Sequence, residues 1–85
     1  MSWLQRVTDR VASACKIDAP PLALPPEDAR DVLEIARIAS HTSGERINAP
    51  LLCYVLGVAA GRGASFRQIV VAAKEAAEAE GAAGD

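Results

Sequence analysis

The polar residues that could do chemistry lie close together between positions 41 and 48: His41, Ser43, Arg46 and Asn48. A histidine, a serine and a glutamate, here Glu45, are side-chain types that perform general acid–base and nucleophilic catalysis. However, His41 is the only histidine in the chain, and the members of a catalytic triad usually come from distant segments held by a larger scaffold. We therefore predict no catalytic residues and no enzyme activity.

The same segment supports two other interpretations. Ser43, Arg46 and Asn48 precede an apolar helix whose first backbone amides point toward the loop, an arrangement that favours a small anion or a nucleotide phosphate. Alternatively, these residues only cap and connect two helices, with His41 ending one helix and Asn48 beginning the next. With a single histidine, a metal would lack ligands, so we predict no metal site and no cofactor.

The elements that position this segment are predicted from capping and turn residues. Ser2 followed by Gln5, and Ser65 followed by Gln68, are typical of capping boxes at helix starts. In the first helix, the apolar residues recur at helical spacing and form one face. The predicted helices span about 2–16, 26–41, 49–61 and 65–80, followed by a frayed tail over 81–85.

The third predicted helix is the most apolar part of the chain, because residues 51–60 contain no charged side chain. A helix that is apolar all round is usually buried on all sides, so we expect it at the centre of the fold. Gly57 in its middle then indicates close approach of a neighbouring backbone, and the hydroxyl of Tyr54 needs a partner. Cys15 and Cys53 are expected to be inert buried thiols.

Four prolines between Lys16 and Pro26 exclude a helix there. We predict an extended crossover in which Leu22 and Leu24 pack into the bundle. Eighty-five residues leave room for one core only. The predicted fold is therefore all-α: a single four-helix bundle-like domain over residues 1–85, with a buried central third helix and a proline-rich crossover between the first two helices.

Composition narrows the possible partners. The net charge is −2 and the nine basic residues are scattered, so we predict no binding to nucleic acid. The longest apolar run, residues 49–61, is shorter than the roughly 20 residues that span a bilayer, so no membrane insertion is expected. The N-terminus has neither the basic nor the apolar region of a signal peptide, and the expected location is the cytoplasm.

Three stretches resemble a known family: residues 36–46, the sequence Ala-Pro-Leu at 49–51, and Gly-Val-Ala-Ala-Gly at 57–61. They are similar to a small actinobacterial domain of unknown function, DUF6457, found alone and attached to or encoded near molybdenum-cofactor guanylyltransferases. The resemblance implies an accessory role in maturation of the molybdenum cofactor (molybdopterin guanine dinucleotide), through contacts with a protein such as that nucleotidyltransferase. It implies no activity, and among its motif positions only His41 and Arg46 are suited to contact a ligand.

Three hypotheses follow for the function. The leading one is a non-enzymatic accessory or protein-interaction module. The second is a protein that binds a small anion or a nucleotide through the 41–48 loop. The third is a homo-oligomeric structural module, such as a homodimer. A core this small and rich in alanine gains stability from association.

Overall fold

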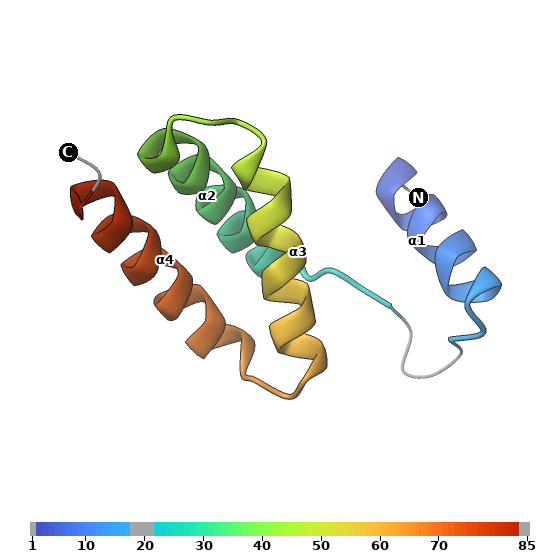
Figure 1. Cartoon of the computed structure of the whole chain (residues 1–85). Helices are drawn as coiled ribbons and strands as arrows, with labels where there is room; N and C mark the ends of the chain where they lie inside the picture. The colour runs from blue at the N-terminus through green and yellow to red at the C-terminus, as the bar shows by residue number, and fades with distance from the viewer. Residues whose placement is uncertain (1, 18–21, 84–85) are drawn as a thin grey trace.

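The computed structural model describes residues 2–17 and 22–83, and within these ranges the chain forms four helices and no strand (Figure 1). The prediction of an all-α fold is confirmed. The helices are α1 (Trp3–Ala14), α2 (Pro26–Ser43), α3 (Asn48–Gly61) and α4 (Phe66–Ala83).

Two of the helix starts have the predicted capping residues. The N–H of Gln5 donates to Ser2 Oγ at 3.0 Å, and the N–H of Gln68 donates to Ser65 Oγ at 3.3 Å. The largest difference lies at the other end of α4, which continues to Ala83 through part of the expected tail. Alanine and glutamate are strong helix formers, and they extend this helix.

The central helix is α2, because it packs against both α3 and α4 while those two helices make fewer contacts with each other. The deepest side chain is that of Ile35 on α2, which is 1 % exposed. Around it lies a small core from α3 and α4, formed by Leu56, Ile69, Val70 and Ala73. The three helices α2–α4 thus form the bundle.

The prediction that α3 is buried on all sides is wrong. Leu56 is its one buried residue, whereas Tyr54 is 74 % exposed and Leu51 and Val55 are also exposed. The physical reason is that α2 and α4 cover only part of α3, and no further helix covers the rest. The hydroxyl of Tyr54 therefore meets water and needs no partner in the protein.

The first helix does not join the bundle. No Cα atom of α1 lies within 8 Å of a Cα atom of α2, α3 or α4, and α1 has no buried residue (Figure 1). Leu22 and Leu24 are exposed rather than packed into the bundle, and Pro20 and Pro21 of the predicted crossover lie outside the described residues. The expected four-helix bundle is thus a three-helix bundle with a separate amphipathic helix.

Overall dimensions reflect this separation. The radius of gyration is 14.4 Å, against about 12 Å for a compact chain of this length. The accessible surface is 6456 Å², against about 4,800 Å² for a compact monomer of the same mass. The chain therefore exposes roughly a third more surface than its size requires.

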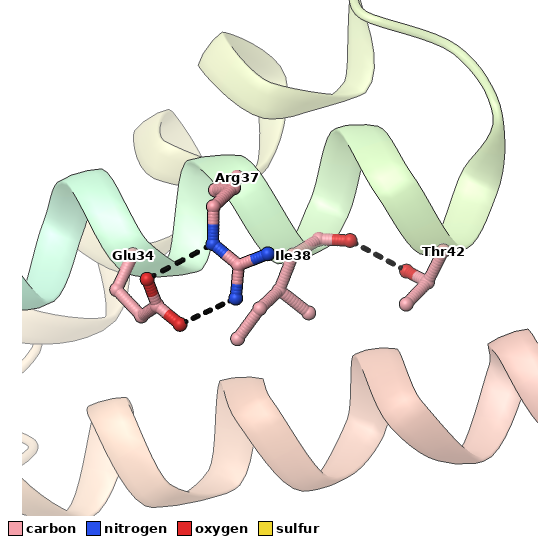
Figure 2. A network of polar contacts seen from close by, with 4 residues as sticks. All are labelled: Glu34, Arg37, Ile38 and Thr42. Carbon is pink, nitrogen blue, oxygen red and sulfur yellow. Dashed lines mark hydrogen bonds and ion pairs between the residues drawn. The ribbon is translucent and has the colours of Figure 1, made fainter.

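The close approach predicted at Gly57 is found elsewhere. A Cβ placed on Gly57 would meet nothing within 4 Å, but one on Gly81 of α4 would lie 3.0 Å from Thr42 Cβ of α2. Thr42 also donates its hydroxyl to the carbonyl of Ile38 at 2.8 Å (Figure 2). With that hydroxyl bonded along its own helix, Thr42 presents carbon atoms to Gly81 and lets α2 and α4 pack closely.

The predicted burial of the thiols is not found. Cys15 is exposed just after α1 and Cys53 is half-buried on α3; both are free. Among the described helices, none has the length and apolarity needed to cross a membrane.

Candidate functional site

The end of α2 uses most of the polar groups that the sequence offered as a site. Gly44 adopts φ 75° and its N–H donates to the carbonyl of Ser40 at 3.0 Å, which ends the helix. The hydroxyl of Ser43 donates to the carbonyl of Ala39 at 2.6 Å and accepts from the N–H of Glu45 at 3.2 Å. Ser43 therefore holds the turn together.

The start of α3 offers fewer donors to an anion than the sequence predicts. Asn48 is the first helical residue, and the N-cap is Ile47, which makes no side-chain capping bond. The N–H of Asn48 donates to Glu45 and that of Ala49 to Arg46, at 3.2 and 3.1 Å. The next residue, Pro50, has no N–H. The interpretation of Asn48 as the N-cap is thus corrected.

The four candidate residues do not converge on one point. Ser43 and Asn48 line a hollow between α2, α3 and α4. His41 and Arg46 are exposed and do not line it. Among the described residues, no group of three or more histidine, cysteine, aspartate or glutamate side chains is placed to hold a metal ion.

A long apolar groove runs between α3 and α4, here called the α3–α4 groove. Two adjoining hollows form it, and they share Leu52, Ala77 and Glu80. The lower hollow, of about 450 Å³, has one charged residue in its lining, Glu80. Its other residues are apolar, namely Leu52, Leu56, Ala59, Ile69, Ala72, Ala73, Ala76 and Ala77. The upper hollow reaches the end of α2 at Ala39, Thr42 and Ser43.

Large apolar side chains form a strip on the exposed side of α3 and of the residue before it, here called the outer stripe; two of them, Leu51 and Val55, also line the upper hollow of the groove. Its members are Ile47, Leu51, Tyr54 and Val55, and more than half of each is exposed. Spacings of four, three and one residues place them on one face of the helix. The signal for this surface was present in the sequence as the uninterrupted apolar run, but it was interpreted as burial.

Charged pairs lie outside the groove. On α2, the guanidinium of Arg37 contacts the carboxylate of Glu34 through both oxygens, at 2.6 and 3.1 Å (Figure 2). These hydrogen bonds lower the pKa of Glu34 and raise that of Arg37. Between helices, Arg67 of α4 and Asp31 of α2 lie 3.9 Å apart. No member of either pair lines the groove, so among the described residues Glu80 is the one charged residue in its lining.

Comparison with known families assigns the whole chain. A family described as a domain of unknown function (DUF6457) matches residues 1–85. The chain belongs to the DUF6457 family. No curated protein and no solved structure matches it. The match covers α1 as well as the bundle, so the separate helix of this DUF6457 chain is part of the family's own domain.

Proposed function

We propose that this DUF6457 chain is a protein-interaction module that contributes contacts and no reaction of its own. The observation that carries the proposal is the outer stripe of α3, where four large apolar side chains are exposed side by side. Contiguous apolar surface of this kind marks interaction sites in proteins that are otherwise polar outside. An exposed tyrosine at its centre is the type of side chain that carries binding energy at interfaces.

The proposed partner is a nucleotidyltransferase of molybdenum-cofactor maturation. This part rests on the resemblance of the 36–61 segment to an actinobacterial domain that occurs attached to guanylyltransferases for that cofactor. In this proposal the partner carries out the nucleotide chemistry in the cytoplasm, and the DUF6457 chain acts as its accessory protein. Tyr54 and its neighbours on the outer stripe supply the contact.

Binding of a small anion or nucleotide at residues 41–48 is the less favoured alternative. The hydroxyl of Ser43 and the first amides of α3 are already bonded within the chain. His41 and Arg46 lie outside the hollow that Ser43 and Asn48 line. An anion would therefore meet few of the donors that the segment holds.

The test is a calorimetric titration of the chain against a purified molybdenum-cofactor guanylyltransferase. Tyr54→Glu places a charge in the middle of the outer stripe. Leu33→Glu is the matched control, because Leu33 is 69 % exposed on α2 and belongs to neither the stripe nor the groove. Loss of an aromatic interface residue weakens the binding free energy by about 1.4 kcal/mol or more, so Kd should rise at least about tenfold for Tyr54→Glu.

Binding by the wild type and Leu33→Glu, with weakened binding by Tyr54→Glu, supports the proposal. Absence of binding by the wild-type chain overturns the assignment of this partner. Equal binding by all three proteins overturns the assignment of the outer stripe as the contact surface. Circular dichroism of both variants checks that the helices remain intact.

A further inference from the structure

The chain holds two apolar surfaces of matching form that do not meet. One is the face of α1, where Leu4, Val7 and Val11 recur at helical spacing and no residue is buried. The other is the α3–α4 groove, whose lower hollow is lined by small and aliphatic side chains. A helix of 12 residues is about 18 Å long, within the roughly 21 Å that the 14 residues of α3 span. The groove thus has the length for a fourth helix of this size.

We propose that the α3–α4 groove is the docking site for α1 of a second copy of this chain, so that two copies exchange their first helices. This goes beyond the proposed function, because it assigns a second copy of the chain to the groove, which shares only Leu51 and Val55 with the outer stripe. Each copy gives one helix and receives one, which closes the assembly with twofold symmetry.

The path of the chain favours a second copy over the same chain. In the view of Figure 1, α3 lies between α1 and α4, and α1 contacts none of the other three helices. Residues 22–25 have no regular secondary structure, and Pro25, with φ −58° and ψ 146°, is in the polyproline II region. As placed, α1 contacts no helix of its own bundle, so its apolar face is open to a neighbouring copy.

Surface area agrees with such an exchange. The accessible surface of 6456 Å² exceeds that of a compact monomer of this mass by about 1,600 Å². Stable protein interfaces bury about 1,200–2,000 Å² in total. The excess surface of the separate chain is therefore of the size that a specific interface removes.

Charge also matches the two surfaces. Residues 3–16 hold three basic side chains against one acidic, Asp9. Residues 74–83 of α4 hold Glu75, Glu78 and Glu80 against Lys74, and among these only Glu80 lines the groove, in both of its hollows. A basic helix beside this acidic part of α4 gains from attraction and is steered toward it. A free partner helix with an acidic polar face would be repelled at the same place.

The experiment is complementation between two full-length variants, read by sedimentation velocity. Val11→Asp places a charge on the apolar face of α1, where the side chain is 48 % exposed and touches no other helix. Ala76→Arg places a long cation in the groove at an exposed position of α4. Each variant retains one working half, so each should be a monomer alone. The mixture should form a heterodimer through one intact contact.

The expected result is a wild-type dimer, a dissociation constant at least about tenfold higher for each variant, and recovery of dimers on mixing. Leu33→Asp, a matched charge on an exposed leucine outside both surfaces, should dimerise like the wild type. A wild-type chain that stays monomeric at high concentration overturns the exchange, whatever the titration with the guanylyltransferase shows. Dimers that persist in either variant, or variants that fail to complement, overturn it as well. Monomeric Val11→Asp that still binds the enzyme separates this inference from the proposed function.

Discussion

The first helix and the α2–α4 bundle have similar sequence patterns but opposite environments. Both show apolar residues at helical spacing, and Ser2 caps α1 in the same way as Ser65 caps α4 of the bundle. In the bundle that spacing leads to buried side chains such as Ile35 and Val70. In α1 it leads to none.

The difference teaches what an amphipathic pattern means. The spacing of Leu4, Val7 and Val11 specifies that one face of the helix avoids water, but it does not specify which surface covers that face. Within a single chain the surface must also be reachable, and in the view of Figure 1 α3 lies between α1 and α4. An uncovered face and an unfilled groove in one small chain are the two surfaces that the proposed exchange of first helices would cover.

The largest expected effect distinguishes the two regions by stability. Ile35→Ala removes a fully buried side chain from the small core, and should lower the free energy of unfolding by about 2–5 kcal/mol. Leu33→Ala, on the exposed side of the same helix, should cost less than about 0.5 kcal/mol. Chemical denaturation measured at low protein concentration provides both values.

The counterpart in the first helix is Val11→Ala. At low protein concentration it should leave the unfolding of the bundle unchanged, because α1 touches none of the other helices. At high concentration it should lower the free energy of unfolding, because the proposed exchange would then dock α1 in the groove of a second copy. If Val11→Ala lowered the free energy of unfolding equally at low and high protein concentration, α1 would be part of the same folded unit as the bundle, contrary to the difference described above.

The elements of this fold could be predicted locally, because the signals that set them are local. Ser2 and Ser65 bond the amide three residues later, as the capping boxes predicted. Gly44 ends α2 in the left-handed conformation, so the helix stops at Ser43, two residues beyond the predicted end. These interactions join residues three or four positions apart, so the sequence alone contains them.

Tertiary relations were predicted less well, because they depend on partners that are distant in the chain. The apolar run of α3 was interpreted as a buried centre, yet Tyr54 and Val55 face outward, since too few helices surround it. Gly81 was placed in a frayed tail, although its approach to Thr42 brings α4 onto α2. A local sequence pattern specifies neither how many helices surround a given helix nor where two helices cross.

The prediction of an anion site at 41–48 did not account for the turn that these residues form. The donors of the segment are already bonded within that turn.

A smaller effect compares the two caps. Removal of an N-cap hydroxyl costs about 1 kcal/mol of helix stability. Ser65→Ala should lower the unfolding free energy of the bundle by roughly that amount, because α4 packs on α2 and its stability is shared with the bundle. Ser2→Ala should instead reduce only the helical signal of α1, seen by circular dichroism or by faster amide exchange in residues 3–14. Equal losses in bundle stability from both variants would show that α1 and the bundle unfold as one unit.

The smallest effect concerns exposed pairs within one helix. The bonds from Arg37 lower the pKa of Glu34, so the folded state holds the ionised carboxylate more strongly than the unfolded chain does. This stabilisation is therefore fully present above the ordinary glutamate pKa, and it is lost as the pH falls through the lowered pKa of the folded state. The difference in free energy of unfolding between the wild type and Glu34→Gln should therefore decrease as the pH falls through that range. Added salt should also reduce this difference, because the pair is exposed.

Asp9→Asn is the matched change in α1, where Asp9 accepts a hydrogen bond from Gln5 at 2.9 Å. At low protein concentration it should leave the pH dependence of bundle unfolding unaltered, and a change equal to that of Glu34→Gln would place α1 inside the cooperative unit.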